Sequence, residues 1–306
     1  MERITAQKAL YIKLGEKGRW ETECLENGIL RVGYHNIPTS LCKKRNWQEV
    51  TALYLSQNAK AGNATRHTNE LREFYEAGAE TLWITFSARR LWWGFAKGPV
   101  SLGTDDDKQR EMAQKWSSTD INGKLLDVAE ISSRLTQVRG FLGTICEVHE
   151  LDYLLRKING EVLPEVKTAK EARDALLASM VPLIQNLTWQ DFELLVDLVF
   201  SSGGWRRVGV LGKTEKDIDI DMIQPVTQER VMVQVKAKSW IEVARKVAET
   251  ATVMKHFNRV FLVTHTFQGR ISKEGLGEQF EILDVNRLAP LVLDAGLSDW
   301  LITKSN

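Results

Sequence analysis

Two short segments in the second half of the chain alternate apolar and polar side chains, and they restrict its fold most strongly. Asp217–Asp221 alternates three aspartates with two isoleucines, and Val231–Lys236 follows further along. A period of two residues predicts β-strands. Because residues i, i+2 and i+4 of a strand share a face, the aspartates lie on one face of their strand, and Gln234 and Lys236 lie on one face of theirs.

The pairing of these two strands would create a particular chemistry. An antiparallel pairing brings carboxylates, an amide oxygen and an ammonium group together. Mg²⁺ prefers oxygen ligands, and a lysine beside such a site suits metal-dependent hydrolysis of a phosphodiester. The alternative is a solvated strand face, which such alternation of charged and apolar residues usually marks.

Length and composition indicate a soluble globular protein of two domains. The chain has 306 residues, of which 43% are hydrophobic and 26% charged, as in ordinary globular proteins. Its net charge of +1 gives no overall basic field, so any surface for DNA must be a local patch. The three scattered cysteines contain no CxxC pair, which argues against disulfides and zinc and suits the cytoplasm. With no apolar leader and no long apolar run, neither secretion nor membrane insertion is expected.

The segment Ile158–Pro164 interrupts the periodic pattern and marks the expected boundary between two halves. It contains a glycine and ends in a proline, residues that commonly break helices and strands. We therefore predict a first domain over residues 1–160, a linker and connecting helix over 161–186, and a second domain over 187–306.

The first half is rich in tryptophan, with six of the ten tryptophans in the first 120 residues. Leu82–Phe86 and Leu91–Ala96 flank Ser87–Arg90 and predict a β-hairpin with a four-residue turn. The pattern as a whole predicts an α+β domain, a small barrel or curled sheet with helices outside. Further strands are expected at 10–14 and 145–148, and helices at 47–55, 68–77 and 151–157.

The second half alternates helices and strands in the order αβββαβ, which predicts a mixed α/β sheet flanked by helices. One helix is expected to begin after Thr188, a suitable N-cap, with Asp191 in its first turn. The expected strands are 205–211, 217–223, 231–236, 259–264 and 280–284, and the other helices are 168–185, 241–257 and 285–295.

Several short motifs of this half occur in a distinctive order. They are Asp191-Phe192-Glu193, Gly203-Gly204-Trp205, Lys216-Asp217-Ile218-Asp219, Val233-Gln234-Val235-Lys236, Val260–Thr264 and Ile282–Asp284. Together they resemble the PD-(D/E)xK nuclease superfamily, and more closely its Mrr-type restriction endonuclease catalytic domain. The resemblance covers roughly residues 187–301 and implies a restriction-endonuclease-like mixed sheet flanked by helices.

The resemblance also implies a metal-dependent active site. Its catalytic residues would be Glu193, Asp219, Gln234 and Lys236, and Mg²⁺ (or Mn²⁺) would be bound by Asp219, Asp221, Gln234 and the main-chain carbonyl of Val235. The lysine would orient or activate the attacking water, or stabilise charge at phosphorus. Gln234 replaces the more general glutamate of the superfamily, as is common in Mrr-type members. Asp219 and Asp221 both remain open as the main metal ligand, and the Lys-Asp-Ile-Asp motif favours Asp219.

The first half resembles the PUA-like group of small barrels, which includes EVE and SRA modules. Leu82–Thr85, Trp92–Ala96 and Trp116–Asp120 carry this resemblance. It implies an aromatic pocket that encloses a flipped base.

Tryptophans and cations in both halves are candidates for contacting DNA, because they suit bases and phosphates. The candidates are Arg89, Arg90, Trp92, Trp93, Lys213 and Lys238. In the alternative interpretation, the tryptophans belong to the core, the arginines lie at an exposed turn, and the lysines belong to a solvated face.

These features predict a Mg²⁺-dependent DNA endonuclease of restriction type with an N-terminal DNA-sensing domain. It would hydrolyse phosphodiester bonds of double-stranded DNA, modified or foreign, in defence against phage. A homodimer is expected, because one such site cuts one strand at a time. The alternatives are a repair or mobile-element nuclease acting on structured DNA, and a degenerate nuclease fold that binds nucleic acid as an adaptor. The intact Asp, Gln and Lys count against degeneration.

Overall fold

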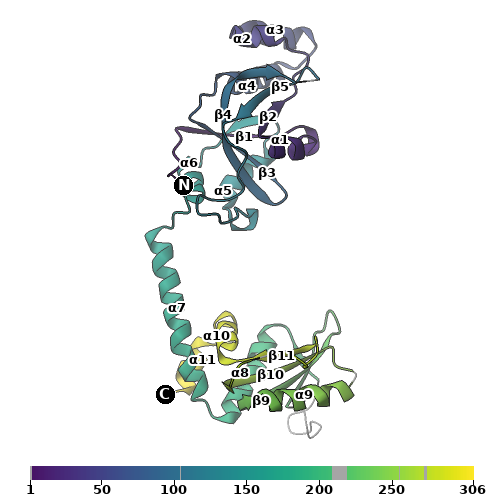
Figure 1. Cartoon of the computed structure of the whole chain (residues 1–306), viewed down its shortest axis with the longest axis vertical. Coiled ribbons are helices and arrows are strands. Elements are labelled where there is room, and N and C mark those ends of the chain that lie inside the picture. Colours follow the sequence, from purple (N-terminus) through teal and green to yellow (C-terminus); the bar gives the residue numbers. More distant parts are fainter. Residues whose placement is uncertain (1, 104, 209–218, 255, 272–273) are drawn as a thin grey trace. The chain divides into compact units, whose positions relative to one another are not determined.

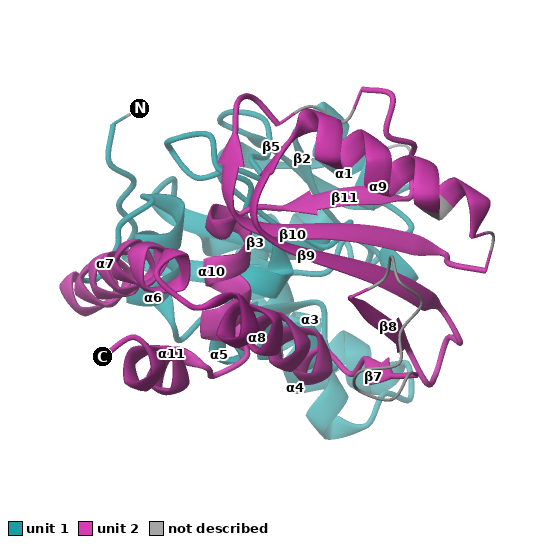
Figure 2. Cartoon of the chain, turned by 90° about the horizontal axis from the view of Figure 1, so that it is seen from below, with its two compact units in different colours: residues 1–163 teal, residues 164–306 magenta. Residues whose placement is uncertain are grey.

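The computed structural model describes residues 2–103, 105–208, 219–254, 256–271 and 274–306 (Figure 1). The chain divides into two compact units, Met1–Leu163 and Pro164–Asn306 (Figure 2). We call them the N-terminal unit and the C-terminal unit. Each has its own sheet and its own apolar core.

Six strands form the sheet of the N-terminal unit, in the order β2-β5-β4-β3-β1-β6. β1 and β3 run parallel, so their carboxyl ends lie at the same end of the sheet, and the other neighbouring pairs are antiparallel. The strands are β1 (Lys8–Ile12), β2 (Ile29–Val32), β3 (Thr81–Ser87), β4 (Arg90–Leu102), β5 (Lys108–Met112) and β6 (Ile145–Glu147).

The small barrel expected for this unit is wrong, because the sheet stays open. Its edge strands β2 and β6 do not pair with each other among the described residues. Two adjacent residues of β3 show why: Trp83 belongs to one apolar cluster and Ile84 to another, and neighbours in a strand face opposite sides of the sheet. Helices thus cover both faces of the sheet, and its edge strands stay unpaired within the described residues, so the sheet forms an open layer.

Helices supply the apolar residues that cover the two faces of this sheet. Residues of α1 and α4 share the cluster of Trp83, and residues of α5 and α6 share the cluster of Ile84. A further cluster joins α2, α3 and α4. The helices are α1 (Glu21–Asn27), α2 (Thr39–Lys43), α3 (Trp47–Ser56), α4 (Ala61–Glu76), α5 (Ser133–Thr136) and α6 (Leu151–Ile158), with 3-10 turns η1 (Glu16–Gly18), η2 (Val128–Glu130) and η3 (Gln137–Gly140).

The hairpin of β3 and β4 turns more tightly than the sequence predicted. Ser87 pairs with Arg90, so the turn consists of Ala88 and Arg89 alone. Both turn residues have positive φ angles, 49° and 61°, as in the type I′ turns that match the twist of two-residue hairpins. Asparagine and glycine usually occupy these positions, because other side chains are strained in the left-handed region. The four-residue turn expected at 87–90 is therefore wrong, although the hairpin itself is present.

The C-terminal unit contains a five-stranded mixed sheet in the order β11-β10-β9-β8-β7. β9, β10 and β11 run parallel, whereas β8 pairs antiparallel with both β9 and β7. The antiparallel pairing expected between the aspartate strand and the Gln-Val-Lys strand is thus present. The strands are β7 (Arg206–Arg207), β8 (Ile220–Ile223), β9 (Arg230–Trp240), β10 (Arg259–Gln268) and β11 (Phe280–Leu283).

Helices flank this sheet on both sides, as Figure 2 shows for α9 on one side and α8 and α10 on the other. Val233 of β9 packs with residues of α7, α8 and α10, and its neighbour Met232 packs with residues of α9. This layered mixed fold agrees with the restriction-endonuclease-like architecture expected here. The helices are α7 (Pro164–Gln185), α8 (Trp189–Ser202), α9 (Ile241–Val253), α10 (Val285–Asp294) and α11 (Ser298–Lys304).

Helix α7 is packed at only one of its ends. Residues 164–175 are exposed throughout, whereas Met180 and Ile184 are buried in the core of the C-terminal unit. Helix α7 covers residues 164–185 of the range 161–186 expected for the linker and connecting helix, and the first half of this helix is exposed to solvent. Among the described residues, none of the helices is long and apolar enough to cross a membrane.

Candidate active site

The pairing of β8 with β9 ends where the catalytic motif of β9 begins. Ile220 pairs with Val233, and no residue before Ile220 continues the ladder within the described residues. Beyond this point the side chain of Asp219, the residue just before β8, replaces the strand as hydrogen-bond partner of β9. Its Oδ2 accepts a hydrogen bond from the backbone N–H of Val235 at 2.8 Å. The end of a strand pair thus fixes a carboxylate against the neighbouring strand.

The same carboxylate oxygen gathers two side chains of β9. Gln234 Nε2 donates to Asp219 Oδ2 at 2.5 Å, and Lys236 Nζ lies 3.5 Å from that oxygen. Gln234 and Lys236 share a strand face, as their spacing predicted. The structure therefore brings together three of the four residues expected to be catalytic.

Glu193, the fourth of these residues, lines the same cavity from α8. The cavity has a volume of about 300 Å³ and is lined by Trp189, Phe192, Glu193, Asp219, Val235, Lys236 and Ala237. The side chains of Glu193, Asp219 and Lys236 are 30%, 29% and 43% exposed, so a substrate can reach them. Helix α8 begins where Thr188 accepts a hydrogen bond from the N–H of Asp191, and this start sets which turn of the helix faces the cavity.

Gln234 is buried, and its amide orientation follows from its partner. Only 6% of the residue is exposed. A carboxylate only accepts hydrogen bonds, so the amide nitrogen must face Asp219 and the amide oxygen must face away from it. In this orientation Gln234 supports the Asp219 carboxylate through its amide N–H, and the expected role of its oxygen as a metal ligand gains no support from the geometry.

Arg207 is a residue of this site that the sequence reasoning missed. Its Nη2 donates to the backbone carbonyl of Asp219 at 3.1 Å, and its guanidinium lies 3.7 Å from carboxylate oxygens of Glu193 and Asp197. Arg207 therefore joins α8 to the residue that carries the central carboxylate. Its only sequence signal was its place in the strand expected at 205–211, next to an equally plausible Arg206.

Asp221 lies outside the cavity and is paired with another residue. Arg230 binds it through two atoms, with Nε 2.9 Å from Oδ1 and Nη2 donating to Oδ2. Its side chain is only 13% exposed. Of the two aspartates that the sequence left open as metal ligand, Asp219 is the one that lies beside Lys236. Asp217, the first of the alternating aspartates, falls outside the described residues.

The oxygen atoms at the cavity suit a hard divalent cation. Asp219 and Glu193 supply carboxylates, and Val235 supplies a carbonyl that points to the same side of β9 as its N–H. Gln234 is buried beside Asp219 and does not line the cavity. Within the described residues there is no group of three or more His, Cys, Asp or Glu side chains arranged to hold a metal ion. Mg²⁺ needs no such group, because it usually keeps several waters and binds one or two carboxylates together with substrate phosphates. The donor set therefore fits Mg²⁺ better than zinc.

A buried histidine packs behind the cavity. The ring of His265 in β10 meets that of Phe192 edge-on, with centroids 4.9 Å apart, and its Nδ1 lies 2.9 Å from Thr266 Oγ1. Burial, aided by the positive charge of Lys238, lowers the pKa of His265. His265 therefore favours its neutral form and supports the cavity wall.

The residues expected to contact DNA have different surroundings. Arg89 and Arg90 are exposed at the hairpin turn, and Lys238 is exposed on β9, while Lys213 falls outside the described residues. Trp92 is partly exposed and donates its ring N–H to the carbonyl of Ser87. Trp93 is 7% exposed and donates to the carbonyl of Thr119 at 2.8 Å, as a core residue would.

Three more tryptophans of the N-terminal unit are also core residues. Trp83 is fully buried, and Trp47 and Trp116 are 9% and 5% exposed. Trp47 and Trp116 donate their ring N–H groups to Glu76 and to the carbonyl of Ile29. The buried indoles of Trp47 and Trp116 have satisfied N–H groups and are committed to packing. Trp83 is fully buried too, although its ring N–H has no hydrogen-bond partner within the described residues.

Comparison with protein families assigns the region of this cavity to a known domain. Residues 184–292 match the family model Mrr_cat, described as a restriction endonuclease, and this range contains Glu193, Asp219, Gln234 and Lys236. No curated protein and no solved structure matched the chain. The expected PUA-like identity of the first half gains no support, because the match lies wholly outside it. Residues 184–292 thus form an Mrr-type restriction endonuclease domain, which supports a restriction-type nuclease that hydrolyses phosphodiester bonds.

Proposed function

We propose that the protein is a Mg²⁺- or Mn²⁺-dependent endonuclease of restriction type acting on double-stranded DNA. The observation that carries the proposal is the arrangement around Asp219. One carboxylate oxygen accepts from Gln234 and Val235 and lies 3.5 Å from Lys236 Nζ, in a cavity within the restriction endonuclease domain.

The side chains of this cavity have distinct proposed roles. Asp219, Glu193 and the main-chain carbonyl of Val235 would hold the cation, which when bound polarises the phosphate and lowers the pKa of a bound water. Gln234 would orient Asp219 through its amide N–H. Lys236 would donate to the attacking water and to the oxygen atoms on which negative charge develops at phosphorus. The ion pair with Asp219 would keep the ammonium group of Lys236 at the cavity for this role.

Arg207 would act as a positioning residue in this reaction. Its guanidinium fixes the backbone of Asp219 and approaches Glu193. It therefore sets the separation of the two carboxylates before a metal binds. An arginine suits this position because its planar fork reaches several acceptors at once.

The proposed substrate is modified or foreign DNA, and cutting both strands calls for two copies of the chain. A single site of this kind acts on one strand at a time, so a homodimer is the simplest arrangement for a double-strand break. The N-terminal unit would select the substrate, with Arg89, Arg90 and Trp92 as the exposed candidates on its hairpin and Lys238 as a candidate near the active site. The exposed half of α7, residues 164–175, would be the tether between selection and cleavage.

A plasmid assay tests the proposal directly. The full-length protein should convert supercoiled plasmid to nicked or linear forms with Mg²⁺ or Mn²⁺ and leave it intact in EDTA. Parallel plasmids, one methylated and one without modification, show whether a modified base is read. Equal cleavage in EDTA would contradict metal dependence, and intact plasmids under every metal condition would favour a binding or adaptor role.

A further inference from the structure

The N-terminal unit contains a cavity at the carboxyl ends of its two parallel strands. We call it the β1–β3 cavity. Its volume is about 530 Å³, within the roughly 300–1,000 Å³ of small-molecule sites. The end of β1, the loop after it, the end of β3 and the turn formed by α5 and η3 enclose it. It is lined by Tyr11, Lys13, Leu14, Gly15, Lys17, Gly18, Glu21, Thr85, Phe86, Thr136, Arg139 and Gly140.

The charges around this cavity favour an anion. Lys13, Lys17 and Arg139 line it, against a single carboxylate from Glu21. Lys17 and Arg139 are exposed, and within the described part of the chain neither has an ion-pair partner. Lys13 donates to the backbone carbonyl of Phe141, so its charge is not neutralised either. Three cations around one concave surface suit a phosphate group, with its larger negative charge, better than they suit a ligand with one carboxylate.

Aromatic rings form another part of the same lining. The rings of Tyr11 and Phe86 lie 6.0 Å apart between centroids and are tilted by 50°. The guanidinium of Arg139 lies 5.7 Å from the ring of Phe86, which places a cation next to the aromatic surface. Burial raises the pKa of Tyr11 to about 12, so its hydroxyl remains a neutral hydrogen-bonding group at neutral pH. Tyr11 and Phe86 belong to a core cluster and are 5% and 9% exposed, so only a small part of each ring reaches the cavity. Such aromatic edges beside cations suit a ligand that combines an aromatic ring with a phosphate.

The loop after β1 is closely packed and requires its glycines. Gly15 and Gly18 have φ angles of 83° and 76°. A Cβ at Gly18 would lie 2.5 Å from a carboxylate oxygen of Glu21, so Glu21 is held against the loop backbone. Lys17 itself has a φ of 52°, a region that favours glycine or asparagine over lysine. The loop thus presents a cation from a backbone conformation that does not itself favour lysine.

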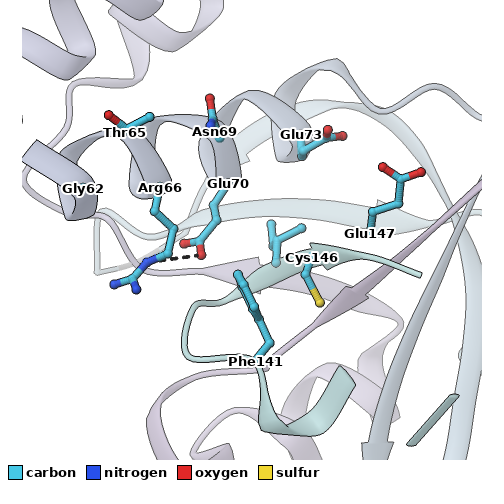
Figure 3. Close-up of a pocket in the computed structure, with 10 residues that line it drawn as sticks. Gly62, Thr65, Arg66, Asn69, Glu70, Glu73, Phe141, Cys146 and Glu147 are labelled. Carbon is cyan, nitrogen blue, oxygen red and sulfur yellow. Dashed lines mark ion pairs between the residues drawn. The ribbon is translucent and has the colours of Figure 1, made fainter. Parts of the chain in front are cut away.

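A second cavity of the same unit has the opposite charge. It has a volume of about 380 Å³, and its lining includes Glu70, Glu73 and Glu147 but only one cation, Arg66 (Figure 3). Glu70 is 3% exposed and accepts hydrogen bonds from the hydroxyl of Tyr34 and the N–H of Thr144. These carboxylates would repel a phosphate. Of the two cavities, the β1–β3 cavity is the one that suits an anion.

We propose that the β1–β3 cavity binds a nucleoside phosphate, with the base against Tyr11 and Phe86 and the phosphate among Lys13, Lys17 and Arg139. The ligand can be a free nucleotide or one nucleotide of a DNA strand, since both present the same base and phosphate. The site is independent of the cleavage chemistry, because its residues all belong to the N-terminal unit. Its test is therefore a binding measurement that needs no catalysis.

The experiment uses the full-length protein in EDTA, so that a nuclease failure and a binding failure remain distinct. Calorimetry measures the affinity for deoxynucleoside 5′-monophosphates, for the matching nucleosides and for inorganic phosphate. Fluorescence anisotropy measures the affinity for single-stranded and duplex oligonucleotides. The nucleotide should bind at least about tenfold more tightly than either the nucleoside or phosphate, because both halves of the site contribute. Binding of mononucleotides indicates a free ligand, and binding of oligonucleotides alone indicates a nucleotide within a strand.

Variants tie this binding to the cavity. Lys17→Asn removes a cation while keeping a residue that tolerates positive φ, and Arg139→Gln removes another. Each should weaken binding about tenfold, a loss of about 1.4 kcal/mol. Arg134→Gln is the matched control, because Arg134 is exposed on α5 and does not line the cavity. Phe86→Leu keeps apolar bulk and removes the ring, with circular dichroism to verify that the variant folds.

Three results would overturn the proposal. The first is unchanged affinity in both Lys17→Asn and Arg139→Gln, and the second is an equal loss in Arg134→Gln. The third is the absence of any preference for nucleotide or oligonucleotide over inorganic phosphate, which would indicate an anion site alone. If Phe86→Leu fails to fold, the two cation variants still decide the outcome.

Discussion

The two units of this protein both contain a mixed sheet, yet they present their reactive side chains in different ways. In the C-terminal unit, Gln234 and Lys236 of β9 meet Asp219, the residue just before β8, where the pairing of these two strands ends. In the N-terminal unit, the residues around the β1–β3 cavity come from the end of β1, the end of β3 and a helical turn far along the chain. The residues of the first group lie close together in the sequence and form a short motif, whereas those around the β1–β3 cavity are spread over the chain from Tyr11 to Gly140 and form none.

The units also differ in how they use aromatic residues. Trp83, Trp93 and Trp116 of the N-terminal unit are buried in its core. Trp189 of the C-terminal unit is 65% exposed and lines the candidate active-site cavity. The half with more tryptophans therefore does not present more of them to a ligand, and abundance alone is a poor guide to a binding surface.

The largest expected effect comes from Lys236, whose ammonium would act at the reacting phosphate. Lys236→Ala should lower the single-turnover cleavage rate about 10³-fold, the loss typical of removing one group that stabilises developing charge. DNA binding should change little, because a single lysine makes one of many backbone contacts. Lys170→Ala is the control, since Lys170 is an exposed lysine on α7 that does not line the cavity. If Lys236→Ala and the wild type cleaved DNA at equal rates, this cavity would not be the active site.

Asparagine variants of Asp219 and Asp221 test which of the two aspartates acts in the candidate site. Asp219→Asn should lower cleavage about 10²-fold and raise the Mg²⁺ concentration needed for half-maximal activity, because the cation loses a charged ligand. Asp221→Asn should keep activity and lower the free energy of unfolding by about 1 kcal/mol, through loss of its pair with Arg230. Cleavage against Mg²⁺ concentration and urea denaturation measure the two effects. The reverse pattern would show that Asp221 is the ligand.

Arg207 tests whether the link between α8 and β8 matters for catalysis. Arg207→Lys keeps the charge but loses the planar fork, and should lower the cleavage rate about tenfold. Arg207→Met should lower the rate further, because Glu193 and Asp197 lose their counter-charge. Both variants should shift the Mg²⁺ dependence if Arg207 spaces the carboxylates. A loss of thermal stability with unchanged Mg²⁺ dependence would assign it a structural role alone.

The smallest expected effect concerns the hairpin turn of the N-terminal unit. Replacing Ala88 and Arg89 by Asn and Gly should raise the free energy of unfolding by about 1 kcal/mol, because both positions have positive φ. If Arg89 contacts a phosphate, the same double variant should lower the salt dependence of DNA binding by about one charge. Ala88→Asn alone is the control, since it relieves the turn and keeps the cation. An unchanged salt dependence would exclude Arg89 from the DNA contact.

The sequence alone was enough to predict the architecture and the central motif of the C-terminal unit. The period of two in Val231–Lys236 predicted a strand, the Thr188 N-cap predicted the start of α8, and the order of motifs predicted the matched restriction endonuclease domain. The strand and the N-cap are local, because each depends on residues within one turn of helix or a few positions of strand. The domain was predicted instead from a resemblance to a known family, carried by motifs spread over residues 191–284.

Three findings came only from the tertiary structure. Asp219, and not Asp221, lines the candidate site, Arg207 contacts this site, and the sheet of the first half is open. Asp221 lies outside the cavity, where it pairs with Arg230, and Arg207 of β7 approaches Glu193 of α8. Of the tryptophans in the motifs that resembled a base-reading barrel, Trp83, Trp93 and Trp116 are buried on the two faces of an open sheet. In each case the outcome depends on a partner distant in sequence, and such pairings are set by packing and charge in three dimensions rather than by local pattern.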